Sequence, residues 1–268
     1  MMRVGVVGAG AVAATLVEGL AAAGYDGALA LYARDPERGC RLARTAGGAG
    51  SVEILASFGA LLQWRPEIVV ECAGHAAVLQ LGESVLAAGA DFLPASLGAL
   101  ADDGFRSRLM DAARRGGARI RIAAGAIGAL DVIGAARLSG IDEITYISRK
   151  PPAAWRGTPA DTGALDDLAA ERVLFEGSAR QAARDYPRNA NVAAAIALAG
   201  TGFDRTMVRL IADPSVEQNI HEIGLRSRCV DMTIRLAGIG SASNPRTSKT
   251  AGFSLAHTVL NLHASLVI

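Results

Sequence analysis

The chain has 268 residues, 51% of them hydrophobic and 20% charged, which excludes an intrinsically disordered protein and predicts one large or two modest globular domains. Its 27 Lys and Arg residues nearly balance its 26 Asp and Glu residues, so no net field favours nucleic acid or an anionic membrane, and a small molecule is the expected partner. The apolar runs are too short to span a membrane and no signal peptide is recognised, which predicts a soluble cytoplasmic protein. The three cysteines are far apart and odd in number, so they indicate neither a disulfide framework nor a thiolate metal site.

The first half of the chain alternates short apolar runs with helical patterns. The expected strands are RVGVVGAG, ALALYA, SVEILA, EIVVECAG, DFLPAS and RIRIAAGA, and the clearest helices are AVAATLVEGLAAAG, HAAVLQLGESVLAAG and DDGFRSRLMDAARRGG. Nearly continuous hydrophobic strands separated by helices indicate a parallel sheet covered on both faces. We therefore predict a doubly wound α/β domain over residues 1–130.

A glycine motif follows the first expected strand and opens the first expected helix. It has the spacing G-x-G-x-x-A, in which Gly8 allows a tight turn and Gly10 lets the backbone approach a pyrophosphate. Ala13 is small enough for close packing of the helix on the strand, and the helix N-terminus at Ala11 and Val12 directs N–H groups at the phosphates. The motif predicts a Rossmann domain that binds NAD or NADP.

The end of the second strand, LALYARD, bears on which nucleotide binds. Ala33 or Arg34 lies where an NAD site usually offers an acidic residue to the ribose, although Asp35 is close enough to reach it. Arg34 is a candidate ligand for the 2′-phosphate of NADP; the alternative is a solvated arginine beside a helix cap. We predict use of both nucleotides or a preference for NADP.

Other strand ends carry small residues at the edge of the sheet where ligands bind. Cys72 and Ala73 lie in ECAGH, Ser96 in PASLGALAD and Ala124 in AAGAIGALD. Small side chains allow a flat nicotinamide ring to approach the backbone, whereas the alternative is that they are ordinary turn residues.

After about residue 140 the pattern changes. DEITYISRK, TMVRLIA, QNIHEIGLRS and VDMTIRLAG are expected strands, and VLFEGSARQAARDY, NVAAAIALAG and KTAGFSLAHTVLNLHASLVI are expected helices that cover one face. Strands that follow one another without crossover helices favour an antiparallel sheet. We predict an α+β domain with a largely antiparallel sheet over residues 131–268, whose last helix can pack back on the first domain, and a loop near the cleft in RKPPAAWRGTPADTGA.

His221, in VEQNIHEI, is the leading candidate for acid–base chemistry among four histidines. If this stretch is extended, His221 shares one face with Glu217 and Asn219, and neither face is apolar throughout, which indicates a strand beside a polar cleft. A histidine titrates near neutrality and can move the protons of an amine oxidation. The alternative is a buried histidine with a purely structural role. His75 is a candidate helix cap or nicotinamide neighbour.

Two further stretches are candidate substrate-binding segments because they precede or open helices. NPRTSKT offers an anion Arg246, Thr247, Ser248 and Lys249, and PRNANVAA contains Asn189 and Asn191. In both places the alternative is a helix cap with solvated neighbours.

The motifs GVVGAGAVA, ECAG, SLGALAD, AGAIGALD, YPRNANVAAAIALAG, NIHEI and NPRTSKTAGFS occur in the order seen in L-aspartate dehydrogenases, and the chain resembles that family over nearly its whole length. The resemblance implies a Rossmann domain that binds NAD(P), and an α+β domain that closes the substrate site and forms a homodimer. It also implies reversible, NAD(P)-dependent conversion of L-aspartate to iminoaspartate, then to oxaloacetate and ammonia, with a possible role in NAD biosynthesis through quinolinate.

The resemblance also assigns roles to residues of this chain. It implies that His221 is catalytic, that Ala124 contacts the nicotinamide side of the cofactor, and that Asn189 and Asn191 contact substrate and cofactor respectively. PASLGALAD departs from the family, which more often has serine followed by valine or isoleucine before the glycine, but Ser96 is retained. The alternatives are another two-domain reductase, of the homoserine dehydrogenase or dihydrodipicolinate reductase type, and a non-catalytic NAD(P)-binding regulator.

Overall fold

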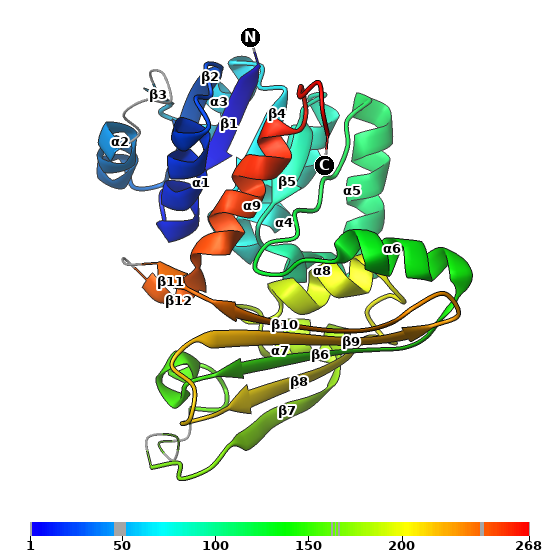
Figure 1. Cartoon of the computed structure of the whole chain (residues 1–268). Coiled ribbons are helices and arrows are strands. Elements are labelled where there is room, and N and C mark those ends of the chain that lie inside the picture. The colour runs from blue at the N-terminus through cyan, green and yellow to red at the C-terminus, as the bar shows by residue number, and fades with distance from the viewer. Residues whose placement is uncertain are drawn as a thin grey trace. The chain divides into compact units, whose positions relative to one another are not determined.

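The computed structural model describes residues 2–45, 52–161, 163, 165, 167–241 and 244–267, and within these ranges the side chains of residues 45 and 241–247 are not described. The chain forms two compact units, one made of Met1–Gly125 with Ala251–Ile268 and the other of Ala126–Thr250 (Figure 1). Among the described residues, no helix is both long enough and apolar enough to cross a membrane.

The first unit is built on a parallel sheet in the order β3-β2-β1-β4-β5. Its strands are β1 (Arg3–Val7), β2 (Ala28–Tyr32), β3 (Val52–Ile54), β4 (Ile68–Glu71) and β5 (Asp91–Pro94). Its helices are α1 (Ala11–Ala22), α2 (Pro36–Thr45), α3 (Phe58–Gln63), α4 (His75–Ala87), η1 (Leu97–Ala101), α5 (Asp103–Gly116) and most of α9 (Lys249–Leu260). Strand order reverses between β1 and β4, which is where a doubly wound sheet binds its ligand.

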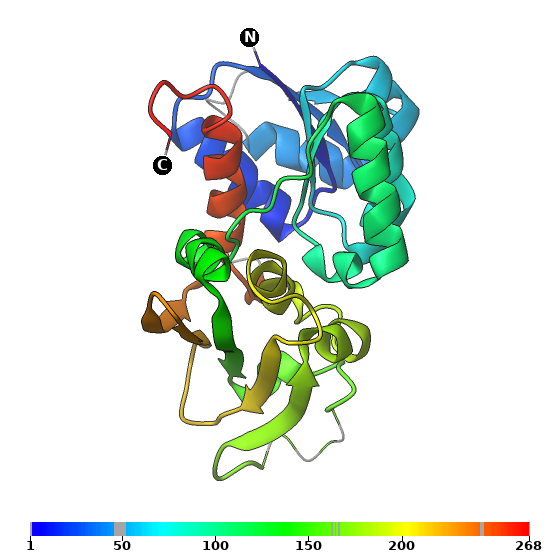
Figure 2. The same ribbon diagram turned by 90° about the vertical axis from the view of Figure 1, so that its right-hand side faces the viewer.

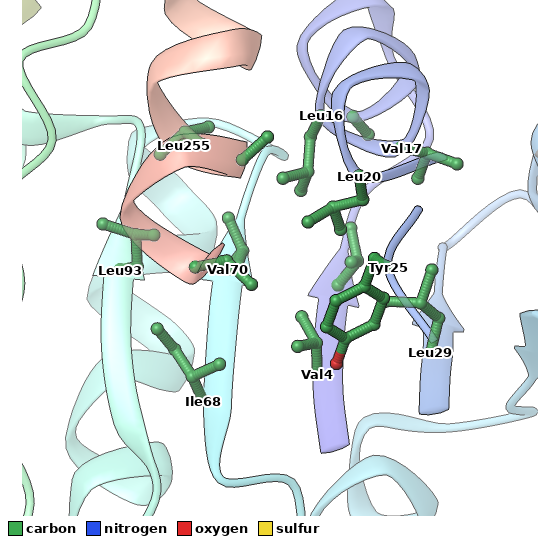
Figure 3. Packing of buried hydrophobic residues seen from close by; sticks show 14 of the residues in the cluster. Val4, Leu16, Val17, Leu20, Tyr25, Leu29, Ile68, Val70, Leu93 and Leu255 are labelled. Atoms are coloured by element: carbon green, nitrogen blue, oxygen red, sulfur yellow. The ribbon is translucent and has the colours of Figure 1, made fainter. Parts of the chain in front are cut away.

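The core of this unit joins the sheet to α1 and α9. Figure 3 shows Val4 and Val70 of the sheet packed with Leu16 of α1 and Leu255 of α9, all of them buried. Burial of each such side chain contributes about 1.5–3 kcal/mol. The two helices approach closely because Gly252 has no side chain: a Cβ there would lie 2.5 Å from the Cβ of Thr15. The C-terminal segment is thus part of the core beneath the glycine motif.

The sixth expected strand, RIRIAAGA, is wrong. Only Ile120 forms a bridge, to Phe92 of β5, through the bonds from Phe92 N to Arg119 O and from Arg121 N to Phe92 O, each 2.8 Å long. The chain then leaves the sheet, and Gly125 adopts a positive φ of 68° that ends any extended course.

The second unit contains a mixed sheet in the order β10-β9-β6-β8-β7, in which only the β6–β8 pair is parallel. Its strands are β6 (Ile141–Lys150), β7 (Arg172–Ser178), β8 (Met207–Ala212), β9 (Asn219–Ser227) and β10 (Asp231–Gly238), and β11 (Gly240–Ser241) pairs with β12 (Asn244–Ser248). Its helices are α6 (Leu130–Ser139), η2 (Pro152–Trp155), α7 (Ala179–Asp185) and α8 (Asn191–Ala199). The predicted fold class, a doubly wound sheet followed by a largely antiparallel one, is confirmed.

The helix expectations for this unit need correction. KTAGFSLAHTVLNLHASLVI is helical only over α9, which ends at Leu260 and lies mostly in the first unit instead of covering the second sheet. VLFEGSARQAARDY is a strand followed by a helix, because its first residues pair with β8 and the helix begins only after Ser178. Ser178 forms a capping box with Gln181, a local signal that fixes where α7 starts. α6 was not expected from the sequence.

One face of this sheet is covered by helices, with α6 against β9 and α7 against β8 (Figures 1 and 2). Ile144 of β6 lies on the covered face, since a Cβ added to Gly200 would approach both Ile133 of α6 and Ile144. Side chains alternate along a strand, so Tyr146, Ser148 and Lys150 share the covered face and Arg149 lies on the other.

Candidate functional site

The carboxyl edge of the first sheet contains a cavity of about 310 Å³. It lies at the switch point between β1 and β4, where nucleotides bind in this architecture. The residues predicted from sequence that line it are Gly8, Gly10, Arg34, Asp35, Cys72 and Ala73.

The glycine motif shapes this cavity for a group with phosphates. Gly8 has a positive φ of 105°, and a Cβ there would lie 2.7 Å from the Cys72 carbonyl oxygen, so only glycine fits the turn. A Cβ on Gly10 would meet nothing within 4 Å, so the space in front of it is open. Gly10 is the N-cap of α1 and no side chain caps the helix, so the N–H groups at Ala11 and Val12 are available to an anion. These features fit a pyrophosphate.

The rim beyond β2 is cationic. Asp35 caps α2 by accepting hydrogen bonds from the N–H groups of Glu37 (3.1 Å) and Arg38 (3.2 Å), and it also pairs with the Arg38 side chain at 3.3 Å. Arg34 is exposed, lines the cavity and forms no hydrogen bond or ion pair with the described residues. Asp35 is therefore committed to the helix and to Arg38, whereas Arg34 is available to a ligand.

Glu71 organises the turn after β4, and the sequence analysis missed it. Its buried carboxylate accepts hydrogen bonds from the N–H groups of Ala73 (2.6 Å), Gly74 (2.5 Å) and Ser96 (3.1 Å) and from the Ser96 hydroxyl (3.2 Å). Burial raises the pKa of Glu71 above its usual value. The carboxylate thus ties the turns after β4 and β5 together, and it engages the hydroxyl of Ser96, which the sequence placed at the ligand-binding edge of the sheet.

Two other residues lie at this edge of the sheet. His75 begins α4, and its Nε2 is buried with no hydrogen-bond partner among the described residues; burial lowers the pKa of this imidazole. Ala124 is half-buried in the segment that left the sheet. That segment is held by the bond from the N–H of Gly125 to the hydroxyl of Ser254, 2.9 Å long, which attaches it to α9.

In the second unit, His221 lies in β9 on the covered face and is 5% exposed. Its Nδ1 lies 2.8 Å from the hydroxyl oxygen of Tyr146, and the two rings stack at 6.0 Å between centroids. Burial, with a smaller effect of the positive charge of Lys150, lowers the pKa of His221 to about 4. The imidazole is therefore neutral at pH 7, with Nδ1 engaged and Nε2 free of any described partner.

Lys150, at the end of β6, is the second titratable group of this face and was not predicted as a site residue. It is 8% exposed, and its Nζ lies 5.0 Å from the centroid of the buried Trp155 ring. Burial lowers the pKa of Lys150 to about 8, so the amine still carries a positive charge at pH 7.

The structure describes the surroundings of some of the remaining predicted substrate residues but not of others. Asn189 and Asn191 are half-buried at the start of α8, whose N-cap is Ala190 rather than either asparagine. Ser248 is buried, and its hydroxyl has no hydrogen-bond partner among the described residues. Lys249 donates its backbone N–H to the carbonyl of Ile239. The side chains of Arg246 and Thr247 lie outside the described part of the structure.

Comparison with known proteins assigns both units. Residues 8–123 match the family described as "Homoserine dehydrogenase, NAD binding domain", and residues 131–262 match "Aspartate dehydrogenase, C-terminal". An L-aspartate dehydrogenase of Bordetella pertussis is 43% identical over 96% of this chain and 94% of its own length, and one from a Polaromonas strain is 39% identical over the full length of both.

The chain belongs to the L-aspartate dehydrogenase family. The crystal structure of an aspartate dehydrogenase from Thermotoga maritima has the same architecture, with a TM-score of 0.80, 27% identity and coverage of 100% of this chain and 99% of that one. The first unit of this family member is an NAD(P)-binding domain, and the sequence resemblance is confirmed.

Proposed function

We propose that the protein is an NAD(P)-dependent L-aspartate dehydrogenase in which His221 is the acid–base residue. The observation that carries this proposal is the buried pair of His221 and Tyr146, which leaves Nε2 of a neutral imidazole on the helix-covered face without a hydrogen-bond partner among the described residues. The substrate is inferred from membership of the family, and the role of His221 is inferred from the chemistry of its pair with Tyr146.

His221 suits the steps that follow loss of hydride from the α-carbon. A bound nicotinamide would supply the acceptor for that hydride, and the amine would lose a proton to give iminoaspartate. In its neutral form, His221 can take a proton from the water that attacks the imine carbon and return it to the nitrogen, which leaves as ammonia. The products are oxaloacetate, ammonia and the reduced nucleotide. Tyr146 can accept a hydrogen bond from Nδ1 or donate one to it, so it supports the imidazole in either tautomer.

For the cofactor, we propose that Gly8, Gly10, Ala11 and Val12 hold the pyrophosphate and that Arg34 favours the 2′-phosphate of NADP. The open space at Gly10 and the uncapped start of α1 support the first assignment, and the exposed guanidinium on the cavity rim supports the second. Asp35, Cys72, Ala73, Ala124 and Asn191 are the other proposed cofactor contacts.

We propose Asn189, Ser96, Arg246, Thr247, Ser248 and Lys249 as substrate contacts on the family resemblance. The unsatisfied hydroxyl of Ser248 supports its assignment, while Ser96 acts at least in part through Glu71. The nucleotide domain is proposed to span residues 1–130 and the substrate domain residues 131–268, with the last helix packing back on the first domain, as most of α9 does in the first compact unit. The resemblance also supports a homodimer and a role in pyridine nucleotide biosynthesis, and free thiols at Cys40, Cys72 and Cys229 support a cytoplasmic location.

The test is a substrate comparison with the purified protein. We expect oxidation of NADPH or NADH with oxaloacetate only when ammonia is present, and no comparable turnover with aspartate semialdehyde or dihydrodipicolinate. Turnover of either of these, with none of oxaloacetate plus ammonia, would replace the proposal with the corresponding reductase. Tight nucleotide binding without turnover of any of the three would indicate a regulator.

A further inference from the structure

The covered face of the second sheet gathers five polar side chains around His221. Tyr146, Ser148 and Lys150 alternate along β6, and Asn219 and His221 alternate along β9. Ser148 is the register partner of His221, and directly opposed residues of an antiparallel pair point to the same side of the sheet. We call these five residues the His221 cluster; all of them are buried.

Ser248 approaches the same face from β12. Gly238 of β10 is the register partner of Asn219, and a Cβ on Gly238 would lie 3.2 Å from the hydroxyl oxygen of Ser248. That oxygen therefore lies on the side of the sheet toward which Asn219 points.

Several polar atoms of this region have no partner within the described part of the chain. The buried hydroxyl oxygens of Ser148 and Ser248 form no hydrogen bond of regular geometry with the described residues, although Ser148 lies close enough to Tyr146 to influence the pKa of that phenol. No described carboxylate forms an ion pair with the Lys150 ammonium. Buried polar atoms in native proteins are nearly always satisfied, so a group of unsatisfied ones in one place calls for an explanation. A bound polar ligand would provide one.

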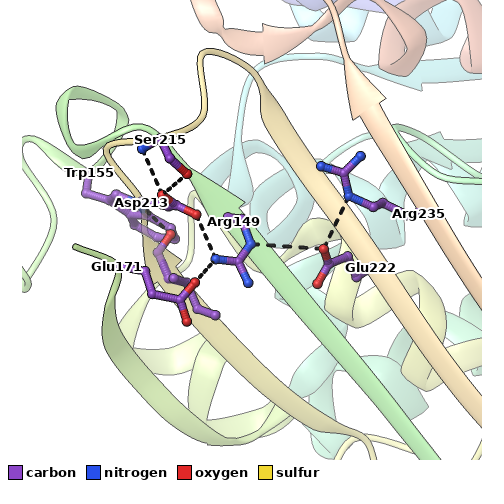
Figure 4. Close-up of polar contacts among 8 residues, drawn as sticks. Arg149, Trp155, Glu171, Asp213, Ser215, Glu222 and Arg235 are labelled. Carbon is purple, nitrogen blue, oxygen red and sulfur yellow. Dashed lines mark hydrogen bonds and ion pairs between the residues drawn. The ribbon is translucent and has the colours of Figure 1, made fainter.

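The neighbouring carboxylates do not neutralise Lys150, because they bind Arg149 on the opposite face. Figure 4 shows Arg149 between Asp213, Glu171 and Glu222; the distances are 2.8 Å to Asp213 and 4.0 Å to Glu222. Asp213 lies next to Lys150, since its N–H donates to the Lys150 carbonyl, yet its carboxylate is taken up by Arg149 and Ser215. Among the described residues, the titratable groups that remain on the Lys150 side are His221, Tyr146 and Tyr186, whose ring packs against Trp155.

An unpaired ammonium in an apolar setting is costly, and the Trp155 ring offsets only part of that cost. Trp155 is itself fixed, because it is fully buried and its indole N–H donates to the carbonyl of Ile211 at 3.2 Å. The amine is thus held beside His221 in a charged form that the described residues do not compensate.

We propose that Lys150 is the cationic anchor for one carboxylate of a dicarboxylate substrate, which binds with the hydroxyl of Ser148 and the amide of Asn219 beside His221. This inference rests on the proposed function and extends it, because it names the residue that binds one of the two carboxylates of the substrate. A carboxylate has only acceptor atoms and matches an ammonium, a hydroxyl and an amide N–H. It would satisfy the unpaired donors of the His221 cluster.

The experiment compares Lys150→Met, Lys150→Arg and a control, Arg172→Met, which removes one exposed cation from β7 of the same sheet. The probe is succinate, which has two carboxylates and no amine, and its affinity is measured by calorimetry with NADP present. For Lys150→Met we expect an affinity about 10- to 100-fold lower at pH 7, the loss typical of a charge-assisted hydrogen bond. We expect a similar rise in the KM for aspartate, unchanged NADP affinity and an unchanged or higher melting temperature, because methionine removes a buried charge.

The pH dependence separates a charge contact from a structural role. Succinate affinity of the wild-type protein is expected to fall as the pH rises through about 8, where the Lys150 amine loses its proton, and this fall should be absent in Lys150→Arg, which stays charged. Arg172→Met should behave as wild type. A Lys150→Met protein that folds and keeps wild-type affinity for succinate overturns the inference. Failure of the wild-type protein to turn over oxaloacetate with ammonia would instead overturn the proposed function. That outcome comes from the turnover assay and is distinguished from the succinate affinity measured by calorimetry.

Discussion

The Tyr146 hydroxyl oxygen lies 2.8 Å from Nδ1 of His221, although the two residues are 75 positions apart in the sequence. They meet because β6 and β9 pair in register, with Tyr146 opposite Ile223 and Ser148 opposite His221. The pairing fixes the orientation of the imidazole and leaves Nε2 without a hydrogen-bond partner among the described residues. Burial raises the pKa of Tyr146, so its hydroxyl stays protonated at any pH at which the enzyme works.

Tyr146→Phe removes this hydrogen bond and keeps the ring that stacks on His221. We expect kcat to fall on the order of 10-fold, the value of one hydrogen bond, with little change in the KM for aspartate or in NADP affinity. Steady-state kinetics with both substrates varied would measure this. An unchanged kcat would mean that the imidazole needs no support from Tyr146.

The depressed pKa of His221 makes stability depend on pH. The imidazole titrates near pH 4 in the folded protein and near 6.5 when unfolded, so the unfolded state binds more protons between these values. The contribution of the neutral imidazole to the free energy of unfolding is complete above pH 6.5 and is lost as the pH falls through 4. Between pH 7 and pH 5 the free energy of unfolding of the wild-type protein should drop by about 2 kcal/mol more than that of His221→Gln. Urea unfolding of both proteins checks this, and equal drops would contradict a depressed pKa.

Arg34→Ala tests the nucleotide preference. Loss of the guanidinium should weaken NADP binding by about 10-fold, as expected for a charge-assisted contact, and leave NAD binding within about 2-fold of wild type. Arg44→Ala, which removes an exposed arginine of α2 that does not line the cavity, is the matched control. If Arg34→Ala binds NADP as tightly as wild type, Arg34 is a solvated residue beside the cap formed by Asp35.

The sequence predicted the fold class because most elements carry their own signal: a glycine motif at the first turn, apolar strands separated by helices in the first half, and strands that follow one another without crossover helices in the second. The prediction failed where hydrogen bonding to a neighbouring strand decides whether a segment becomes a strand. The segment after α5 has strand composition, yet only Ile120 bridges the sheet. The strand β7 was expected to be helical because residues on both sides of Ser178 were taken as one helix, although a capping box starts there.

The site was predicted in the same uneven way. His221 has a local polar setting, and the glycine motif has a fixed spacing, so both were identified as candidates. Tyr146, Lys150 and Glu71 were not, because their roles depend on which face is covered and which strands are neighbours, and neither is visible in one sequence. The signals available were modest: Lys150 is one of two lysines in the chain, and Glu71 is an acid at the end of an apolar strand.

The most direct test of the central claim is ammonia-dependent reduction of oxaloacetate by the wild-type protein and by His221→Ala, measured together with NADPH affinity. We predict turnover by the wild-type protein, a kcat lower by about 10²- to 10⁴-fold in the variant, and equal NADPH affinity in both. A variant that binds NADPH normally and turns over oxaloacetate and ammonia at the wild-type rate would contradict the assignment of His221 as the acid–base residue.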